Sequence, residues 1–335
     1  MIKRYIRRIY KYHHGQKIIK STEVQNTNGK IELFYAKARV LQIMKGLSIL
    51  IPVYCDSCVD QVKQLCRQCL GLKMLWEIIV ADDGSPGAAA SLNDEVAEME
   101  GCRLIKRPVN IGRAAIRNFL AHEARFDTLI YMDAGMIPSE DLVGTYMRYT
   151  GKAKVVCGSI GVSKDCIDDT NLRCLNELKA EKAFSLRKRN MSPYTNFHSG
   201  NFMIDRMTML DNPFSEKIKT YGYEDTLLGK SLADKHVSII HIDNPLFFVH
   251  FESNARFLEK TEEALRTLYD LREELQGYSS LLRLVSHLQR YHLLWITVWI
   301  KWLYSRSIKN NLLGPTPKLF LFNIFRICYL SGCFL

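Results

Sequence analysis

The chain has 335 residues, which is enough to bury a full hydrophobic core and to form about two domains. Its formal net charge of +11 and its pI of about 9.1 favour acidic partners such as phosphates, a nucleotide or an anionic membrane surface. Nucleic acid is another acidic partner, but the sequence holds no recognisable nucleic-acid-binding motif, so we expect no nucleic-acid partner.

The first twenty residues are strongly basic and contain no acidic residue. Among the basic residues, Ile2, Tyr5, Ile6, Ile9 and Tyr10 recur at near-helical spacing. Two interpretations stay open, a basic amphipathic segment and a solvated arm. No apolar stretch follows, so the pattern is not that of a secretory signal peptide. We treat residues 1–46 as a basic lead-in to the first folded domain.

Ten cysteines raise the possibility of a zinc site. Cys55 and Cys58 form one closely spaced pair, and Cys66 and Cys69 form another. However, Cys66 and Cys69 share one face of a predicted helix with Val62, and the seven residues between the pairs are fewer than common zinc modules use. We therefore expect free thiols in a reducing compartment.

Two apolar runs at 47–53 and 77–81 each end at a turn, which we call an elbow; Tyr54 lies in the first elbow, and Asp82 and Asp83 lie in the second. Continuous runs of this kind suit strands buried on both faces of a parallel sheet, and the helical pattern at 59–72 joins them into a βαβ unit. Ligands of such sheets bind beyond the carboxyl ends of the strands. Pro52 and Tyr54 are expected to line a base pocket there, where the ring can stack on a base and the Asp83 carboxylate can accept an imide N–H.

The pattern of alternating strands and helices continues to about residue 256. Further strands are predicted at 103–106, 128–132, 154–159, 200–204, 237–241 and 246–249, and helices at 225–232 and 257–276. The segment Arg187–Pro193 is interpreted as a basic loop that covers a donor, contacts an anionic acceptor such as a lipid diphosphate, or is simply solvated. The predicted fold class is α/β, with a mostly parallel Rossmann-like sheet flanked by helices over residues 47–256.

Residues 257–335 are predicted to be helical and membrane-associating. The run Leu293–Ile300 is too short to span a bilayer, which needs about 20 apolar residues, and the run Leu319–Leu335 is interrupted by Asn323 and Arg326. Tryptophan and tyrosine mixed with lysine and arginine are typical of a membrane interface. The alternative is a helical cap on the main domain. We favour monotopic attachment at the cytoplasmic face of the inner membrane.

Several motifs occur in one order along the chain. Besides the two elbows they are Asn110-Ile-Gly-Arg-Ala-Ala-Ile-Arg-Asn118, Tyr131-Met-Asp-Ala-Gly-Met-Ile-Pro138, Ser199-Gly-Asn-Phe202, Tyr221-Gly-Tyr-Glu-Asp225 and Val249-His250. Together they resemble a family 2 glycosyltransferase with the GT-A fold, over roughly residues 47–268. The resemblance also suggests a bacterial surface-polysaccharide enzyme.

The resemblance implies a nucleotide-sugar donor. The Asp83 position contacts the base in that family, and a carboxylate selects bases with a ring N–H, so UDP is expected first, with dTDP and GDP as alternatives. Asn110, Gly112, Arg113 and Arg117 are expected beside the diphosphate, because glycine permits close approach, a helix N-terminus follows it, and the two arginines share one helix face. The arginines would either hold the diphosphate or close the loop over it, and the alternative is a surface arginine pair.

The metal motif of the family departs from its pattern here. Asp-x-Asp supplies hard oxygen ligands to a divalent cation, but this chain has Asp133-Ala-Gly135. We consider three outcomes: Mn²⁺ or Mg²⁺ held by Asp133 and His250 with phosphates and water, charge compensation by the two arginines, or nucleotide binding without catalysis.

The resemblance assigns the general base of an inverting transfer to Asp225. Glu224 would bind acceptor hydroxyls, Tyr221 and Tyr223 would offer stacking faces, and Gly200 and Asn201 would form the floor beneath the acceptor. The predicted function is transfer of a hexose or N-acetylhexosamine from a UDP-sugar to a glycan or lipid-linked acceptor. The alternatives are a silent nucleotide-binding membrane scaffold and a nucleotidyltransferase.

Overall fold

The computed structural model describes residues 10–13, 16–19 and 44–335. The chain divides into two units, Met1–Ile43 and Met44–Leu335. In the first unit, β1 (Tyr10–His13) and β2 (Gln16–Ile19) form an antiparallel pair. The amphipathic segment expected at residues 2–10 lies outside the described residues except for Tyr10, which begins strand β1 and not a helix.

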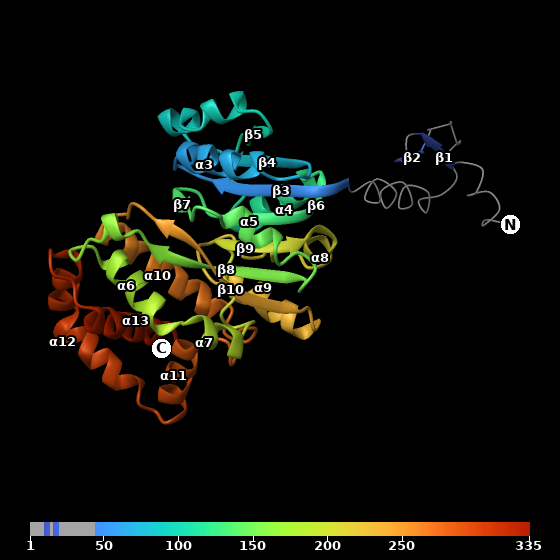
Figure 1. Ribbon diagram of the computed structural model, residues 1–335. Helices are drawn as coiled ribbons and strands as arrows, with labels where there is room; N and C mark the ends of the chain where they lie inside the picture. The colour runs from blue at the N-terminus through green and yellow to red at the C-terminus, as the bar shows by residue number, and fades with distance from the viewer. Residues whose placement is uncertain (1–9, 14–15, 20–43) are drawn as a thin grey trace. The chain divides into compact units, whose positions relative to one another are not determined.

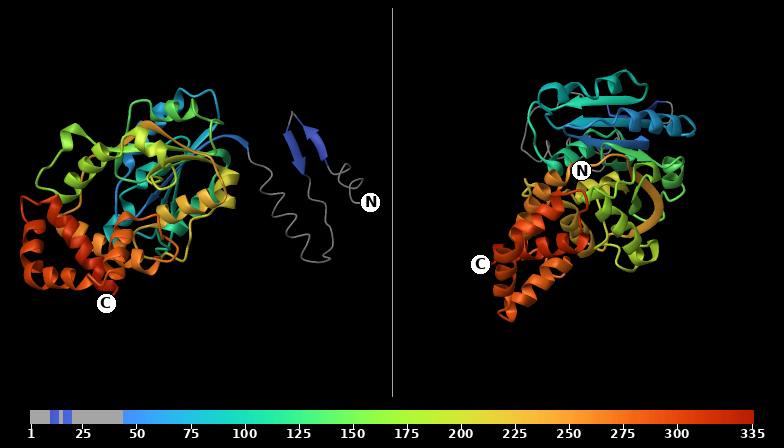
Figure 2. Two further views of the ribbon diagram at one scale, coloured as in Figure 1. Left: turned by 90° about the horizontal axis from the view of Figure 1, so that it is seen from below. Right: turned by 90° about the vertical axis from the view of Figure 1, so that its left-hand side faces the viewer.

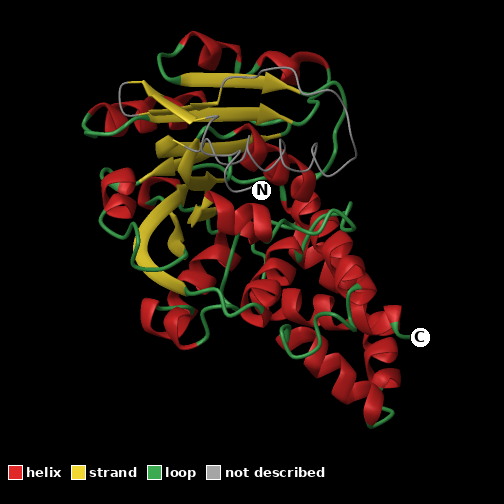
Figure 3. Cartoon of the chain, turned by 90° about the vertical axis from the view of Figure 1, so that its right-hand side faces the viewer, coloured by secondary structure: helices red, strands yellow, loops and turns green. Residues whose placement is uncertain are grey.

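The second unit is built on one sheet with the strand order β5-β4-β3-β6-β9-β8-β10-β7 (Figures 1 and 3). The pairs β3–β4, β4–β5, β3–β6 and β8–β10 are parallel, and the other three pairs are antiparallel. The predicted mostly parallel α/β sheet is therefore confirmed. The strands are β3 (Met44–Val53), β4 (Trp76–Asp82), β5 (Cys102–Lys106), β6 (Phe126–Met132), β7 (Met136–Pro138), β8 (Val155–Val162), β9 (Asn201–Asp205) and β10 (Ile239–Phe248).

Helices cover both faces of this sheet, and each face has its own apolar cluster. On one face, Ile49 and Ile51 of β3 pack with Val62 and Leu65 of α3. On the other face, Leu50 of β3 packs with residues of α4 and α9. Alternate residues of β3 enter opposite clusters because side chains along a strand point to opposite faces. The helices are α3 (Val59–Leu70), α4 (Arg113–Glu123), α5 (Leu142–Met147), α6 (Leu172–Ala183), α7 (Leu186–Met191), α8 (Arg206–Asp211) and α9 (Glu224–Asp234), with short 3₁₀ turns at Gly87–Ser91, Asp94–Glu98 and Lys164–Cys166.

Three local features differ from the sequence-based expectation. The two strands predicted around 237–249 are one strand, β10, whose register shifts between His241 and Pro245. The short strand β7 was not predicted, and it pairs antiparallel with the end of β10. The predicted basic loop at 187–193 is largely helix α7, because Arg189 is buried and donates to the Gly158 and Ile242 carbonyls at 2.7 and 3.2 Å.

The C-terminal part is helical, as expected, and packs against the end of the sheet domain (Figure 2). Two apolar clusters join these helices: Phe257 and Leu258 meet α12 and α13, while Leu265 and Leu268 meet α11 and α13. Among the described residues, none of the helices has both the length and the apolar character needed to cross a bilayer. The helices are α10 (Asn254–Asp270), α11 (Ser280–Arg290), α12 (Leu294–Leu313) and α13 (Leu319–Cys333).

Candidate active site

The elbow after β4 is fixed to the loop that precedes α4. Both carboxylate oxygens of Asp83 accept backbone hydrogen bonds, from the Ile111 N–H at 2.9 Å and the Gly112 N–H at 3.0 Å. Burial raises the pKa of Asp83, and these two bonds oppose that shift. Asp83 therefore couples the expected base-binding elbow to the start of the helix that carries Arg113 and Arg117.

The other residues predicted for the base and the diphosphate lie at the same edge. Tyr54 follows β3 and is 51% exposed, and Pro52, two residues earlier, is half-buried. Asn110 is exposed and Gly112 is half-buried at the N-cap position of α4. Beyond the sheet edge these side chains leave aromatic and polar groups accessible to a ligand.

A cluster of two arginines and two carboxylates forms the centre of the site. Arg117, whose side chain is 1% exposed, donates to Asp133 Oδ1 at 2.5 Å. Arg113 Nε donates to Glu224 Oε1 at 2.7 Å, and its Nη2 lies 3.5 Å from Asp133 Oδ2. These contacts join the start of α4, the end of β6 and the start of α9. The structure thus brings together four residues that are up to 111 positions apart in the sequence.

The charges of this cluster shift its carboxyl groups in opposite directions. Burial alone would raise the pKa of Asp133 and of Glu224, but the neighbouring arginines outweigh it and lower both. For Asp225, burial together with the negative charge of Glu224 raises the pKa to about 6. Adjacent acids with separated pKa values are typical of a site with a distinct proton acceptor.

The turn that presents Glu224 and Asp225 is held by α10. Glu263 of α10 accepts from the Tyr221 N–H at 2.9 Å, and Thr267 Oγ1 donates to the Tyr221 carbonyl at 3.0 Å. Gly222 has a φ of +102°, and a Cβ at this position would lie 2.7 Å from Ala264 Cβ. Only glycine fits a left-handed turn so close to a helix.

The two tyrosines of this turn have different surroundings. The Tyr221 ring lies 5.2 Å from the Arg113 guanidinium and 5.7 Å from Lys260 Nζ, at the edge of the charged cluster. Tyr223 packs against the apolar cluster of the C-terminal helices instead. The expected acceptor-stacking role therefore fits the surroundings of Tyr221, while Tyr223 anchors the turn.

The predicted acceptor floor also divides into two roles. The Gly200 carbonyl accepts from the Asp133 N–H at 2.9 Å, and a Cβ on Gly200 would lie 3.1 Å from Asp133 Oδ2, so this residue borders the charged cluster. Asn201 is fully buried, and its amide bonds Tyr146, Ser159 and Asn244. Because Asn201 has no exposed surface here, its side chain supports the sheet rather than facing an acceptor.

The two residues predicted to hold a metal ion together, Asp133 and His250, each contact a different side chain. His250 Nε2 lies 3.5 Å from Asp56 Oδ1, whereas the Asp133 carboxylate is bound by the two arginines. A Cβ on Gly135 would lie 2.5 Å from Asp56 Oδ2 and 3.0 Å from His250 Cε1. Within residues 10–13, 16–19 and 44–335, no group of three or more His, Cys, Asp or Glu side chains is arranged to hold an ion.

Three residues of the site were not predicted from the sequence: Asp56, Glu263 and Thr267. Asp56 lies two positions after Tyr54, and an acid beyond a strand end is a signal that could have indicated it. Glu263 and Thr267 hydrogen-bond the backbone of Tyr221, a contact that exists only in the folded chain. Their spacing in the sequence shows only that they lie near each other on α10.

The fold and this edge of the sheet define an α/β protein of the GT-A type. The model of the family described as Glycosyl transferase family 2 matches residues 48–212, so the chain contains a family 2 glycosyltransferase domain. This match confirms the predicted family for residues 48–212 and, with it, the prediction of a glycosyltransferase domain there. No curated protein matches the sequence at a significant level.

Solved structures with a similar fold are remote in sequence. S. aureus TarS has 15% identity and a TM-score of 0.45, and the match covers 70% of this chain and 40% of that one, so this chain spans about two fifths of that protein. TarS 1-349 in complex with UDP has 15% identity and a TM-score of 0.47, with coverage of 87% and 91%. The mannosyltransferase PcManGT from Pyrobaculum calidifontis, solved with GDP-Man and Mn²⁺, has 13% identity and a TM-score of 0.48, with coverage of 90% and 76%. These values are too low to transfer any ligand or residue role to this chain.

Proposed function

We propose that this glycosyltransferase moves a hexose or N-acetylhexosamine from a UDP-sugar to a hydroxyl group of a glycan or lipid-linked acceptor, with inversion. The observation that carries this proposal is the pair Glu224–Asp225 at the start of α9, next to two arginines that could receive a diphosphate. A base with a pKa near the working pH combines a deprotonated resting state with sufficient basicity.

In the proposed reaction, Asp225 accepts the proton of the acceptor hydroxyl as that oxygen bonds to the anomeric carbon. The bond between the anomeric carbon and the UDP oxygen breaks on the opposite face, and both bonding electrons leave with UDP. Glu224, whose side chain is only 6% exposed, positions Arg113 by accepting from its Nε at 2.7 Å, so the predicted contact of Glu224 with acceptor hydroxyls does not fit its burial. The Tyr221 ring provides a stacking face for the acceptor sugar.

Arg113 and Arg117 would stabilise the negative charge of the leaving diphosphate. The Arg113 side chain is 42% exposed, so it can exchange its 3.5 Å contact with Asp133 for a phosphate oxygen. Arg117 is buried and keeps Asp133 in place. A divalent cation, when bound, would offset further charge on the diphosphate, with Asp133, Asp56 and His250 as the available ligands at this edge.

The donor base is proposed to bind between Tyr54 and the Asp83 elbow. Each carboxylate oxygen of Asp83 uses one lone pair for a backbone N–H and retains another acceptor site. Uracil offers a ring N–H to that acceptor, whereas cytosine and adenine do not. This chemistry favours UDP over CMP or ADP donors.

The C-terminal helices support a proposal of attachment to a membrane surface, at the cytoplasmic face of the inner membrane. Trp295, Trp299 and Trp302 of α12 are 58%, 57% and 75% exposed, and Lys301 and Arg306 are exposed between and after them. Large exposed aromatic side chains flanked by basic ones are typical of a monotopic membrane contact.

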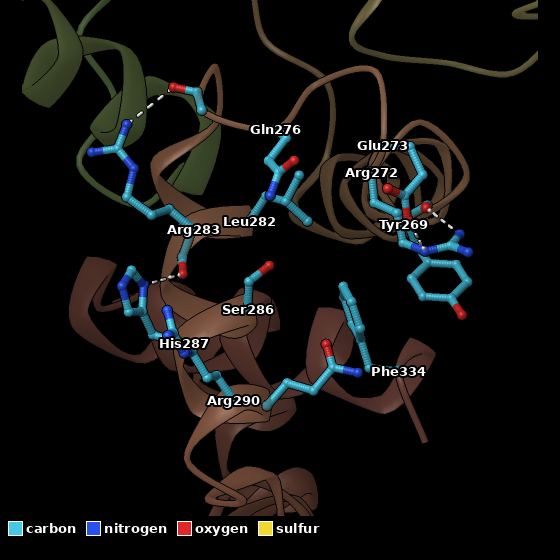
Figure 4. Close-up of a pocket in the computed structure, with 12 residues that line it drawn as sticks. Tyr269, Arg272, Glu273, Gln276, Leu282, Arg283, Ser286, His287, Arg290 and Phe334 are labelled. Carbon is cyan, nitrogen blue, oxygen red and sulfur yellow. Dashed lines mark hydrogen bonds and ion pairs between the residues drawn. The ribbon is translucent and has the colours of Figure 1, made fainter.

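A basic hollow beside this region would suit anionic lipid head groups. It has a volume of about 610 Å³ and lies between the ends of α10 and α13 and one side of α11. Arg272, Arg283, Arg290 and His287 line it together with one acid, Glu273 (Figure 4). Arg283 and His287 each also contact a backbone carbonyl at 3.0 and 2.7 Å, which holds them in place.

The function is tested by incubating the protein with UDP-, dTDP-, GDP- and CMP-sugars and measuring donor consumption and nucleotide binding. Consumption of a UDP-sugar alone is the expected result. Tight UDP binding without consumption, with or without a panel of glycan acceptors, would favour the silent scaffold instead, for which the missing second carboxylate at Gly135 is the supporting observation.

A further inference from the structure

Gly135 stands where the second carboxylate of the metal motif is expected, and the surroundings show why a larger residue does not fit. Its φ is +72°, in the left-handed region. A Cβ there would lie 2.5 Å from Asp56 Oδ2 and 3.0 Å from the His250 ring. The space next to position 135 is therefore taken by a carboxylate and an imidazole from other parts of the chain.

The loop that carries Asp56 is held firmly from two sides. Cys55 has a φ of +54°, which is unusual for a residue with a side chain, and its N–H donates to Ser85 Oγ at 2.8 Å. The Asp56 carbonyl accepts from Nδ2 of the buried Asn93 at 2.9 Å, and Asn93 Oδ1 accepts from the Cys58 N–H. A strained and well-anchored loop indicates that the position of Asp56 is specified by the fold.

His250 reaches the same place through the pairing of β10 with β7. Phe248 pairs with Met136, so the residues that follow β10 lie beside Gly135, which precedes β7. His250 Nε2 is 3.5 Å from Asp56 Oδ1, and both side chains retain exposed surface, 59% for His250 and 38% for Asp56. The other polar contact of this Asp56 oxygen is the N–H of Ser57 at 2.8 Å.

We propose that Asp56 replaces the missing second carboxylate of the Asp-x-Asp motif and binds Mn²⁺ together with His250. One carboxylate and one imidazole are few ligands, but cations at nucleotide sites obtain further ligands from phosphates and water. The imidazole favours Mn²⁺ over Mg²⁺, which prefers oxygen ligands alone. Asp133 keeps its bond to the buried Arg117 through Oδ1. The phosphate ligands in this inference rest on the proposed UDP-sugar donor, whereas the Asp56–His250 pair does not.

The test is titration of Mn²⁺ into the full chain, followed by electron paramagnetic resonance of free Mn²⁺, with and without UDP. Asp56→Asn and His250→Ala should each weaken Mn²⁺ binding by at least about tenfold, since even outer groups around a metal contribute that much. Asp60→Asn, an exposed acid at the start of α3, is the matched control and should bind as the wild type does. Melting temperatures show that the variants are folded.

A second variant tests the exchange of carboxylates directly. Asp56→Ala removes the carboxylate that a Cβ at position 135 would meet at 2.5 Å, and aspartate is one of the few residues that adopt the left-handed backbone found there. If the exposed His250 ring shifts by a few tenths of an ångström, the double variant Asp56→Ala/Gly135→Asp should regain Mn²⁺ affinity that Asp56→Ala loses. Wild-type Mn²⁺ affinity in Asp56→Asn, or no Mn²⁺ binding by the wild type in either titration, would overturn the proposal. Mn²⁺ binding that depends on Asp56 without any binding of UDP would uphold the metal pair and contradict the proposed donor.

Discussion

Arg113 Nε lies 2.7 Å from Glu224 Oε1 and thereby joins the first helix of the expected donor side to the acid pair of the expected acceptor side. The same guanidinium also lies near Asp133. A phosphate that draws Arg113 away from these carboxylates would alter the charge beside Asp225. In the proposed reaction, donor binding and proton acceptance are therefore linked through Arg113.

This link predicts the pH dependence of the reaction. Asp225 must be deprotonated to accept a proton, and its pKa is raised to about 6, so kcat/KM should fall as the pH drops below about 6 and level off above it. Glu224→Gln removes the negative charge that helps to raise this pKa and should move the acid limb to lower pH. A pH profile of Glu224→Gln that coincides with that of the wild type would show that Asp225 is not the titrating group.

The salt bridge of the buried Arg117 predicts a large loss of stability in Arg117→Met. Removal of the guanidinium leaves Asp133 with only the more distant Arg113. Breaking a buried ion pair lowers the free energy of unfolding, here by about 3 kcal/mol. We expect a value at the lower end of the usual range because Asp133 is partly exposed. The control Arg148→Met breaks an exposed pair with Asp141 and should cost less than about 1 kcal/mol. Urea denaturation measures both.

The ion pair between Arg117 and Asp133 also makes the free energy of unfolding depend on pH. The arginines lower the pKa of Asp133 in the folded state, so their contribution is present at neutral pH and is lost as the pH falls through that lowered pKa. The difference between wild type and Arg117→Met should therefore shrink in acid. A difference that stays constant between neutral pH and strong acid would mean that Arg117 stabilises the protein by packing alone.

Truncation of Tyr221 and of Tyr223, the two tyrosines of the turn that precedes α9, should have different effects on activity and stability. Tyr221→Ala removes the ring beside Arg113 and should raise the acceptor KM by about tenfold, the effect of roughly 1.4 kcal/mol, with little change in melting temperature. Tyr223→Ala creates a cavity among the C-terminal helices and should lower the unfolding free energy by about 3 kcal/mol. If both variants lost stability equally, Tyr221 would be a packing residue too.

Membrane attachment is best tested by substitutions on α12, because removal of the C-terminal helices would uncover Leu265 and Leu268 of α10. Trp299→Ser/Trp302→Ser should reduce flotation with vesicles of phosphatidylglycerol and phosphatidylcholine. Leu70→Ser, which changes an exposed apolar residue on α3, serves as the control. Equal flotation of both variants and the wild type would remove α12 as the contact.

Much of the sheet could be predicted from the sequence because its central strands are continuous apolar runs. Residues 47–53, 77–81 and 128–132 are such runs, and all three lie in strands of the structure. Strand β7 could not be predicted, because three residues give no period and its pairing partner is more than 100 positions away. β10 looked like two strands because Pro245 and Asn244 usually mark a turn, yet here they accompany a register shift.

The positions of Asp83, Arg113, Asp133 and Asp225 were predictable because each of them follows a strand or lies at the start of a helix. The direction in which each side chain points was not predictable from the sequence. Tyr221 and Tyr223 are two positions apart in one motif, but only the fold of the turn against α10 shows which ring faces the charged cluster. The pairing of Asp56 with His250 likewise depends on strands that meet only in the folded chain.

The central claim is tested most directly by comparing wild type and Asp225→Asn for consumption of a UDP-sugar and for calorimetric binding of UDP. We predict that the variant binds UDP with unchanged affinity, folds at least as stably because a buried charge is removed, and consumes the donor at least about a hundredfold more slowly. Unchanged turnover in Asp225→Asn would contradict the assignment of the base, and absence of UDP binding in the wild type would contradict the proposed donor.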